Sequence, residues 1–107
     1  MLIPLKIIFC DSPASGVITE EVRKHARILD QFADHILHCL VVIDTVGSHP
    51  QRGLLWDVRL EVTLKGQELA VERGHHHEDI GVVLDDAFET ALRLVADYVQ
   101  CRQREAK

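Results

Sequence analysis

The chain has 107 residues, of which 47% are hydrophobic and 27% are charged. These proportions are typical of one soluble domain with a single core. The formal net charge of −5 argues against an indiscriminate nucleic-acid binder, which usually carries a basic surplus, but it leaves room for a local basic patch. No apolar run approaches the roughly 20 residues that a membrane-spanning helix needs. We therefore expect neither a membrane nor DNA as a partner.

The three cysteines, Cys10, Cys39 and Cys101, form no CxxC pair. Two of them lie in apolar runs, where a free cysteine behaves as a small hydrophobic residue. We therefore expect reduced thiols and a cytoplasmic protein. The apolar start MLIPLKIIF is short and lacks a basic region and a small-residue cleavage site, so we interpret it as a strand rather than a signal peptide.

The first half of the chain predicts a strand, a helix and a second strand. Residues 2–9 are apolar, and Pro4 suits the first residue of a strand or the edge of a sheet. Apolar residues three and four positions apart predict an amphipathic helix over residues 16–36, with Ser15 as its N-cap. Residues 37–46 are rich in β-branched and other apolar side chains, which is typical of a strand.

The second half predicts a hairpin followed by a helix. Residues 54–64 alternate between apolar and polar side chains, which indicates a strand with one buried face and one wet face. A tight turn at Gly66 leads into residues 68–72 as the hairpin partner. Residues 80–101 repeat the helical spacing, and we expect residues 102–107 to form a frayed tail.

The predicted order is therefore β-α-β-β-β-α, in a single domain over residues 1–107. Each helix has one apolar face, so the pattern predicts an α+β two-layer sandwich, in which two helices pack on one face of a four-stranded sheet. The other face is predicted to be open to water and to carry Asp57, Arg59, Glu61, Thr63 and Glu68. The first strand, with Pro4, is expected at a sheet edge. An exposed edge can pair with a second copy, so a homodimer stays open.

The most unusual stretch is RGHHHED, residues 73–79, between the last strand and the last helix. Its two carboxylates would complement the dipole of that helix and cap its free N–H groups. Three adjacent histidines do not easily face one ion, because zinc sites use ligands with intervening residues. We interpret His75, His76 and His77 as loop residues with at most an incidental, low affinity for a metal ion. We predict no metal site and no cofactor.

Signs of catalysis are few. The sequence holds no nucleophile elbow, Walker loop, dinucleotide-binding fingerprint or EF-hand loop. His38 and Cys39 are adjacent on a predicted strand, so their side chains point to opposite faces. Asp85 and Asp86 are neighbours on a predicted helix and point about 100° apart, as on a solvated acidic face. We expect no enzyme; a metal-dependent one would require the loop histidines to converge with another ligand.

The element order, closing with HEDIGVVLDDAFETALRLVADYVQ, resembles the ribosome hibernation-promoting factor and protein Y family, also known as ribosome-associated inhibitors or sigma-54 modulation proteins. ILDQFADHI is similar to the end of the family's first helix, and LEVTLKGQELAVE fits its hairpin. The resemblance covers essentially the whole chain and is to the short form, without a C-terminal dimerisation extension. It implies a bacterial protein that binds the small (30S) ribosomal subunit in the channel for messenger and transfer RNA. Such a protein would block translation during stress or stationary phase.

The resemblance also implies how the ribosome is bound: basic side chains along the two helices face phosphates of ribosomal RNA (rRNA). Carried onto this chain, it gives the RNA-binding candidates Arg23, Lys24, Arg27, Arg93, Arg102 and Arg104, and it places His25 close to a basic position. The last helix departs from the family pattern, because it is mostly acidic, with Asp79, Asp85, Asp86, Glu89 and Asp97. The same charges are equally typical of solvated helix faces.

The expected function is thus a non-enzymatic, ribosome-associated translation inhibitor. The alternative is a protein–protein interaction module of the same fold that does not bind ribosomes. The geometry of charge separates the two hypotheses. Basic residues that converge on one surface favour RNA binding, whereas acidic residues of the last helix that interrupt this surface favour the protein-binding module.

Overall fold

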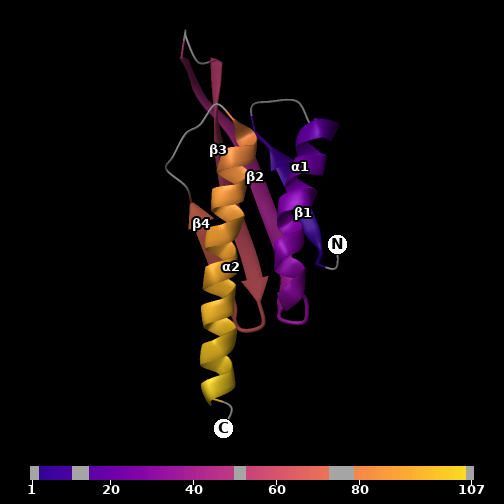
Figure 1. Cartoon of the computed structure of the whole chain (residues 1–107), viewed down its shortest axis with the longest axis vertical. Helices are drawn as coiled ribbons and strands as arrows, with labels where there is room; N and C mark the ends of the chain where they lie inside the picture. The colour runs from indigo at the N-terminus through magenta and orange to yellow at the C-terminus, as the bar shows by residue number, and fades with distance from the viewer. Residues whose placement is uncertain (1–2, 11–14, 50–52, 73–78, 106–107) are drawn as a thin grey trace.

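The structure, a computed structural model, describes residues 3–10, 15–49, 53–72 and 79–105. The predicted order β-α-β-β-β-α is confirmed, with one 3₁₀ helix added after the first helix (Figure 1). The elements are β1 (Leu5–Phe9), α1 (Gly16–Ala26), η1 (Arg27–Phe32), β2 (Ile36–His49), β3 (Gly53–Leu64), β4 (Gln67–Glu72) and α2 (Ile80–Glu105). Figure 1 shows α1 and α2 side by side on the same side of the sheet, as the two-layer sandwich predicts.

The four strands form one mixed sheet in the order β1-β2-β3-β4. β1 runs parallel to β2, whereas β2–β3 and β3–β4 are antiparallel pairs. The helical crossover through α1 explains the parallel pair, and connections of only a few residues allow the antiparallel pairs. β1 lies at an edge of the sheet, as expected.

The core lies between the sheet and the two helices. Alternate residues of β3 point into it and are buried, which confirms the predicted alternation. The helices contribute buried residues at spacings of three and four, among them Leu29 of η1 and Phe88 of α2. No polar or charged side chain is buried among the described residues. Burial of apolar area is therefore the main stabilising term at this interface.

The first helical segment is shorter than predicted. Helix α1 begins where expected, because the Ser15 side chain accepts a hydrogen bond from the backbone N–H of Ile18 at 3.3 Å. It ends at Ala26, however, and the chain tightens into η1 and then a turn in which the His35 N–H donates to the carbonyl of Phe32 at 2.9 Å. The helical spacing continues through residue 36, but Ile36 is buried as the first residue of β2.

Helix α2 extends further than predicted. The Asp79 carboxylate accepts a hydrogen bond from the Gly81 N–H at 2.9 Å, so Asp79 lies at the start of the helix, as expected. The helix then continues to Glu105, so residues 102–105, expected in the frayed tail, are helical. Among the described residues, no helix combines the length and the apolar character that crossing a membrane requires.

The open face of the sheet differs from the prediction in one respect. On β3 and β4 it is mostly polar, as expected. On β1 and β2 it carries the apolar residues Ile8, Leu40 and Val42, which are exposed or partly exposed. The reason is that β2 is apolar on both faces: Val41 and its alternate neighbours fill the core, while Leu40 and Val42 point away from it.

Candidate nucleic-acid interface

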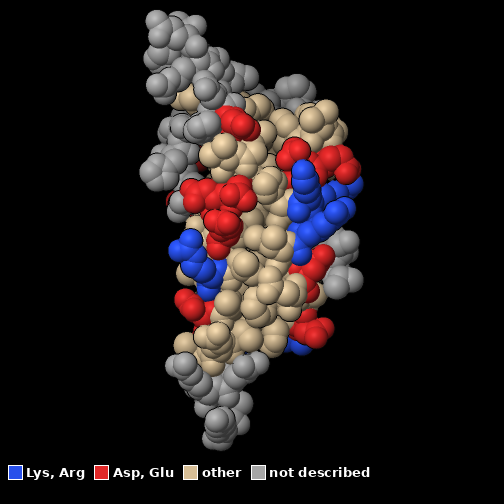
Figure 2. All heavy atoms as spheres, in the orientation of Figure 1, with Lys and Arg blue, Asp and Glu red and all other residues tan. Residues whose placement is uncertain are grey.

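Helix α1 and the start of η1 gather three of the predicted RNA-binding residues: Arg23, Lys24 and Arg27, here called the α1 basic cluster. Residues three and four positions apart are neighbours on a helical surface, so these side chains lie together. All three are exposed. Figure 2 shows the resulting positive patch over α1.

Two of the three cations in the α1 basic cluster have no ionic partner in the described part of the chain. The Arg23 guanidinium lies 3.2 Å from the Glu20 carboxylate, and both side chains are more than half exposed. An exposed ion pair of this kind contributes little to stability, about 0–1 kcal/mol, so Arg23 can exchange Glu20 for another anion. Lys24 and Arg27 form no ion pair with a described residue. The cluster therefore remains available to bind an anion.

His25 lies at the boundary between the two helices. Its Nε2 is 3.5 Å from a carboxylate oxygen of Glu21, and its Nδ1 is 3.9 Å from a carboxylate oxygen of Asp85 on α2. Its side chain is only 22% exposed. His25 thus faces carboxylates between the helices, so this position adds little to a phosphate-binding surface.

Helix α2 presents a surface of mixed sign. Arg93 is exposed, but Glu89 and Asp97, one helical turn to either side, are exposed as well. Asp85 is 64% exposed and lies against His25. In Figure 2 the acidic side chains over α2 interrupt the basic ones, and an uncharged strip separates them from the α1 basic cluster.

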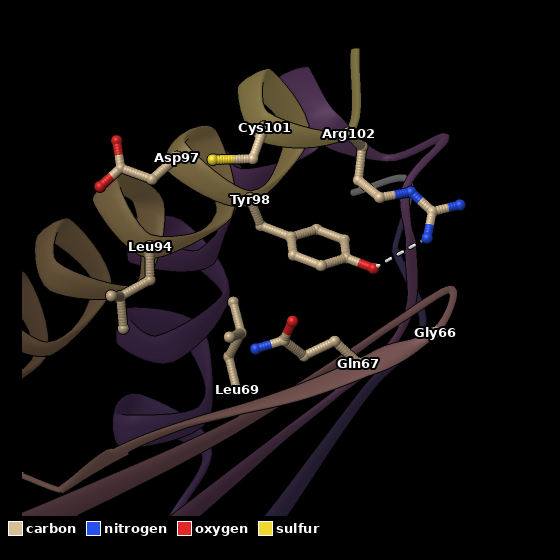
Figure 3. A pocket seen from close by; sticks show the side chains of 8 residues that line it. All are labelled: Gly66, Gln67, Leu69, Leu94, Asp97, Tyr98, Cys101 and Arg102. Atoms are coloured by element: carbon tan, nitrogen blue, oxygen red, sulfur yellow. Dashed lines mark hydrogen bonds between the residues drawn. The ribbon is translucent and has the colours of Figure 1, made fainter. Parts of the chain in front are cut away.

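Arg102 lies at the far end of α2, beside the turn of the β3–β4 hairpin. The Tyr98 hydroxyl donates a hydrogen bond to the backbone carbonyl of Lys65 at 2.9 Å, which ties α2 to this turn. The Arg102 guanidinium lies over the Tyr98 ring, 5.9 Å from its centroid, in a cation–π arrangement. An open pocket of about 570 Å³ lies between the hairpin and α2 (Figure 3). The residues that line it are Gly66, Gln67, Leu69, Leu94, Asp97, Tyr98, Cys101 and Arg102.

The predicted site residues are thus only partly brought together. Arg23, Lys24 and Arg27 form one cluster on the helical side of the molecule. Arg93 lies on the other helix between the exposed Glu89 and Asp97. Arg102 lies further along that helix, against Tyr98, and the side chain of Arg104 lies outside the described residues. The basic surface is therefore centred on α1 and interrupted on α2.

The histidine loop, with His75, His76 and His77, lies outside the described residues. Among the residues that are described, no group of three or more histidine, cysteine, aspartate or glutamate side chains is arranged to hold a metal ion.

The three cysteines are free and differ in exposure: Cys39 is buried, Cys10 is partly buried and Cys101 is exposed. Burial raises the pKa of the Cys39 thiol from its ordinary value of 9.0 to about 12. Because the thiolate is the nucleophile, this residue is unreactive at neutral pH. It also lies on the core side of β2, whereas His38 points to the other face, as the strand pattern predicts.

Two features of this region were not predicted from the sequence. The Tyr98–Lys65 hydrogen bond joins residues 33 positions apart, and no sequence signal marks it. The contact between Arg102 and Tyr98 does have a signal, because residues four positions apart are neighbours on a helix.

Comparison with solved structures identifies the fold. The Thermus thermophilus Protein Y N-terminal domain superposes with a TM-score of 0.67 at 22% sequence identity, over 87% of this chain and 94% of that domain. This chain has the fold of the protein Y N-terminal domain. The structure of a ribosomal subunit interface protein from Coxiella burnetii superposes with a TM-score of 0.65 at 13% identity, over 92% of this chain and 97% of the other.

These two neighbours confirm, at the level of the fold, the resemblance to the hibernation-promoting factor and protein Y family. No protein-family model matches the sequence, and no curated protein matches it. The likeness thus lies in the arrangement of elements rather than in closely similar residues. A binding surface has to be argued from this chain's own charges.

Proposed function

We propose that this protein is a ribosome-associated translation inhibitor, a hibernation factor that binds the small ribosomal subunit and its rRNA. The observation that carries the proposal is the α1 basic cluster: three exposed cations on a rigid helical segment, two of them without an ionic partner among described residues. It lies on a fold shared with a protein Y domain and with a ribosomal subunit interface protein.

Phosphate contacts explain how such a cluster would bind folded RNA. Each cation that neutralises a phosphate releases condensed counterions, so the affinity falls as salt rises. Folded RNA is recognised largely through its shape and backbone, and a rigid helix presents its cations in a fixed arrangement. For three contacts, affinity should fall about 20- to 40-fold between about 50 and about 200 mM salt.

The acidic surface of α2 sets the orientation that we propose. Phosphates repel Asp85, Glu89 and Asp97, so α1 would lie nearest to the rRNA. Arg93 would extend the contact only where Glu89 and Asp97 are turned away, and Arg102 and Arg104 would extend it from the end of α2. The protein would act in the cytoplasm, as a non-enzymatic factor, by occupying space on the subunit that translation needs.

Co-sedimentation with purified 30S subunits and 70S ribosomes, at about 50 and about 200 mM salt, tests the proposal. The test variant carries Arg23→Ala, Lys24→Ala and Arg27→Ala. The matched control removes three other exposed cations, with Lys6→Ala, Arg59→Ala and Lys65→Ala on the sheet and the hairpin. We expect stoichiometric binding that weakens with salt, is lost in the test variant and persists in the control.

The result that would overturn the proposal is equally specific. If the folded wild-type protein does not pellet with ribosomes at either salt concentration, ribosome binding is excluded. Equal losses in the two triple variants would show that net charge, rather than the α1 basic cluster, controls binding. A reconstituted translation reaction tests whether binding inhibits translation. The wild type and the control should inhibit it, and the test variant should not.

The second candidate function is a protein–protein interaction module. The exposed carboxylates of α2 favour it, because they interrupt the basic surface and would suit a basic protein partner. In the same experiment, a folded protein that fails to pellet with ribosomes would favour this candidate.

A further inference from the structure

We propose that two copies of this chain associate face to face through the open side of the sheet. The contact would centre on Ile8, Leu40 and Val42, here called the sheet strip. This surface lies opposite the helices, so the proposal does not depend on ribosome binding.

The sheet strip is apolar surface that the helices do not cover. Ile8 is 37% exposed, and Leu40 and Val42 are partly exposed. In the parallel pairing of β1 with β2, Ile8 lies opposite Val42. The alternate residues of both strands, such as Ile7 and Val41, pack into the core on the other face. A second apolar surface would be needed to remove the strip from water.

Charges of opposite sign flank the sheet strip in one row across the sheet. Lys6 of β1 lies opposite Leu40 of β2, and Leu40 lies opposite Glu61 of β3. The row is therefore positive, apolar and negative, with neighbouring strands about 4.8 Å apart. Neither Lys6 nor Glu61 forms an ion pair with any other residue in the described part of the chain. If a second copy covers this face with its strands in the reverse order, the positive end of each row faces the negative end of the other.

A two-fold axis parallel to β2 provides that reversal. It places β2 over β2 of the second copy, and β1 over β3. Lys6 then faces Glu61 of the partner subunit, and the symmetry repeats the pair on the other side of Leu40. Two sheets packed in this way are aligned, with strand directions within about 30° of each other, as in β-sandwiches.

A hollow beside the sheet strip fits the same arrangement. It has a volume of about 180 Å³ and is lined by Cys10, Val42, Asp44, Asp57 and Arg59. Ile8, Val42 and Arg59 share one row of the register. The proposed axis therefore places Ile8 of the partner subunit over Arg59, at the rim of the hollow. An exposed apolar side chain of one copy would thus meet a recess in the other.

The contact should be weak. Three strands about 4.8 Å apart, each about five residues long, cover on the order of 250 Å². Stable complexes bury about 800 Å² per partner. Asp44 and Asp57, which are paired across β2 and β3, would also approach the same pair of the second copy at one end of the strip. Association should therefore depend on concentration.

Analytical ultracentrifugation of the purified full chain, from about 10 µM to about 1 mM, tests the proposal over the range expected for a weak interface. The weight-average mass should rise from that of a monomer toward that of a dimer. Lys6→Glu and Glu61→Lys should each weaken association at least fivefold, because each places like charges opposite each other. The double variant should restore it, since the exchanged charges pair again across the axis.

The matched control is Glu68→Lys, which makes the same change of charge on β4, outside the overlapping strands. It should leave association unchanged. Val42→Glu should abolish association while circular dichroism shows a folded chain. A wild type that stays monomeric at about 1 mM overturns the proposal. A double variant no better than its parents overturns the two-fold arrangement.

Discussion

Tyr98 and Lys65 are 33 residues apart, yet the Tyr98 hydroxyl donates a hydrogen bond to the Lys65 carbonyl at 2.9 Å. The bond joins the last turns of α2 to the β3–β4 turn. Arg102 lies over the same ring, so the position of a predicted RNA-binding residue depends on this contact. The hairpin and the end of α2 are therefore expected to respond together to substitution.

Tyr98→Phe should remove the hydrogen bond and keep the ring. Because the bond is exposed, we expect a loss of about 0.5–1 kcal/mol in the free energy of unfolding. Urea denaturation followed by circular dichroism would measure it. Tyr98→Leu removes the aromatic face as well and should reduce the free energy of unfolding further. Equal stability of the wild type and Tyr98→Phe would show that the bond contributes nothing.

Gly66 adopts a positive φ of 93°, which L-amino-acid side chains rarely adopt. A Cβ at this position would also lie 3.3 Å from the Tyr98 hydroxyl. We expect Gly66→Ala to reduce the free energy of unfolding by about 1–3 kcal/mol. Gly66→Asn should reduce the free energy of unfolding less than Gly66→Ala, because asparagine adopts positive φ more readily than alanine. The same urea titration would compare the two, and an unchanged Gly66→Ala variant would contradict the strain argument.

Ser15 caps α1, the helix that carries most of the α1 basic cluster, through its bond to the Ile18 N–H. Ser15→Ala should cost about 0.5–2 kcal/mol in the free energy of unfolding, since a helix N–H loses its acceptor. Ser15→Asp keeps an acceptor and is the control. Thermal unfolding would rank the three proteins. An alanine variant as stable as the aspartate variant would rule out a contribution from the cap.

Cys39 gives the protein a defined response to alkaline pH. Below about pH 9 its thiol is neutral in both the folded and the unfolded state. Above that pH the unfolded thiol ionises, whereas burial keeps the folded pKa at about 12. The unfolded state then binds fewer protons, so stability falls as the pH rises from about 9 toward about 12. Urea titrations of Cys39→Ala and wild type across this range should converge as the pH rises.

Thiol labelling checks the same assignment independently. At pH 8 a disulfide reagent should modify the exposed Cys101 rapidly, the partly buried Cys10 more slowly and Cys39 only on unfolding. Cys101→Ser should remove the rapid phase and leave the Cys39 phase unchanged. Rapid labelling of Cys39 in the folded protein would contradict its burial.

The acidic surface of α2 should limit affinity for ribosomes. Glu89→Lys removes a charge that phosphates repel and adds one that they attract, so we expect ribosome binding to tighten about 3- to 10-fold at low salt. Glu68→Lys makes the same change on the opposite side of the molecule and should have no effect on binding. Co-sedimentation at several protein concentrations would measure both. An equal gain in the two variants would contradict a specific role for α2.

Much of the fold could be predicted because its elements have strong local signals. Alternation along residues 54–64 indicates a strand with one buried face, and β3 buries the side chains expected. Ser15 and Asp79 mark helix starts that the structure confirms. The α1 basic cluster is local too, because its three residues lie within about one turn of each other.

The sequence by itself therefore determined the order of elements, the inward faces and the α1 basic cluster, because each depends on residues close together in the chain. Only the tertiary structure decided where the first helix ends, since burial of Ile36 in β2 outweighs a helical pattern that continues through it. It also decided that His25 faces Asp85 and that the Tyr98 hydroxyl bonds to the Lys65 carbonyl. Finally, it left Leu40 and Val42 of a uniformly apolar strand on the open face, because the helices cover only one side of the sheet.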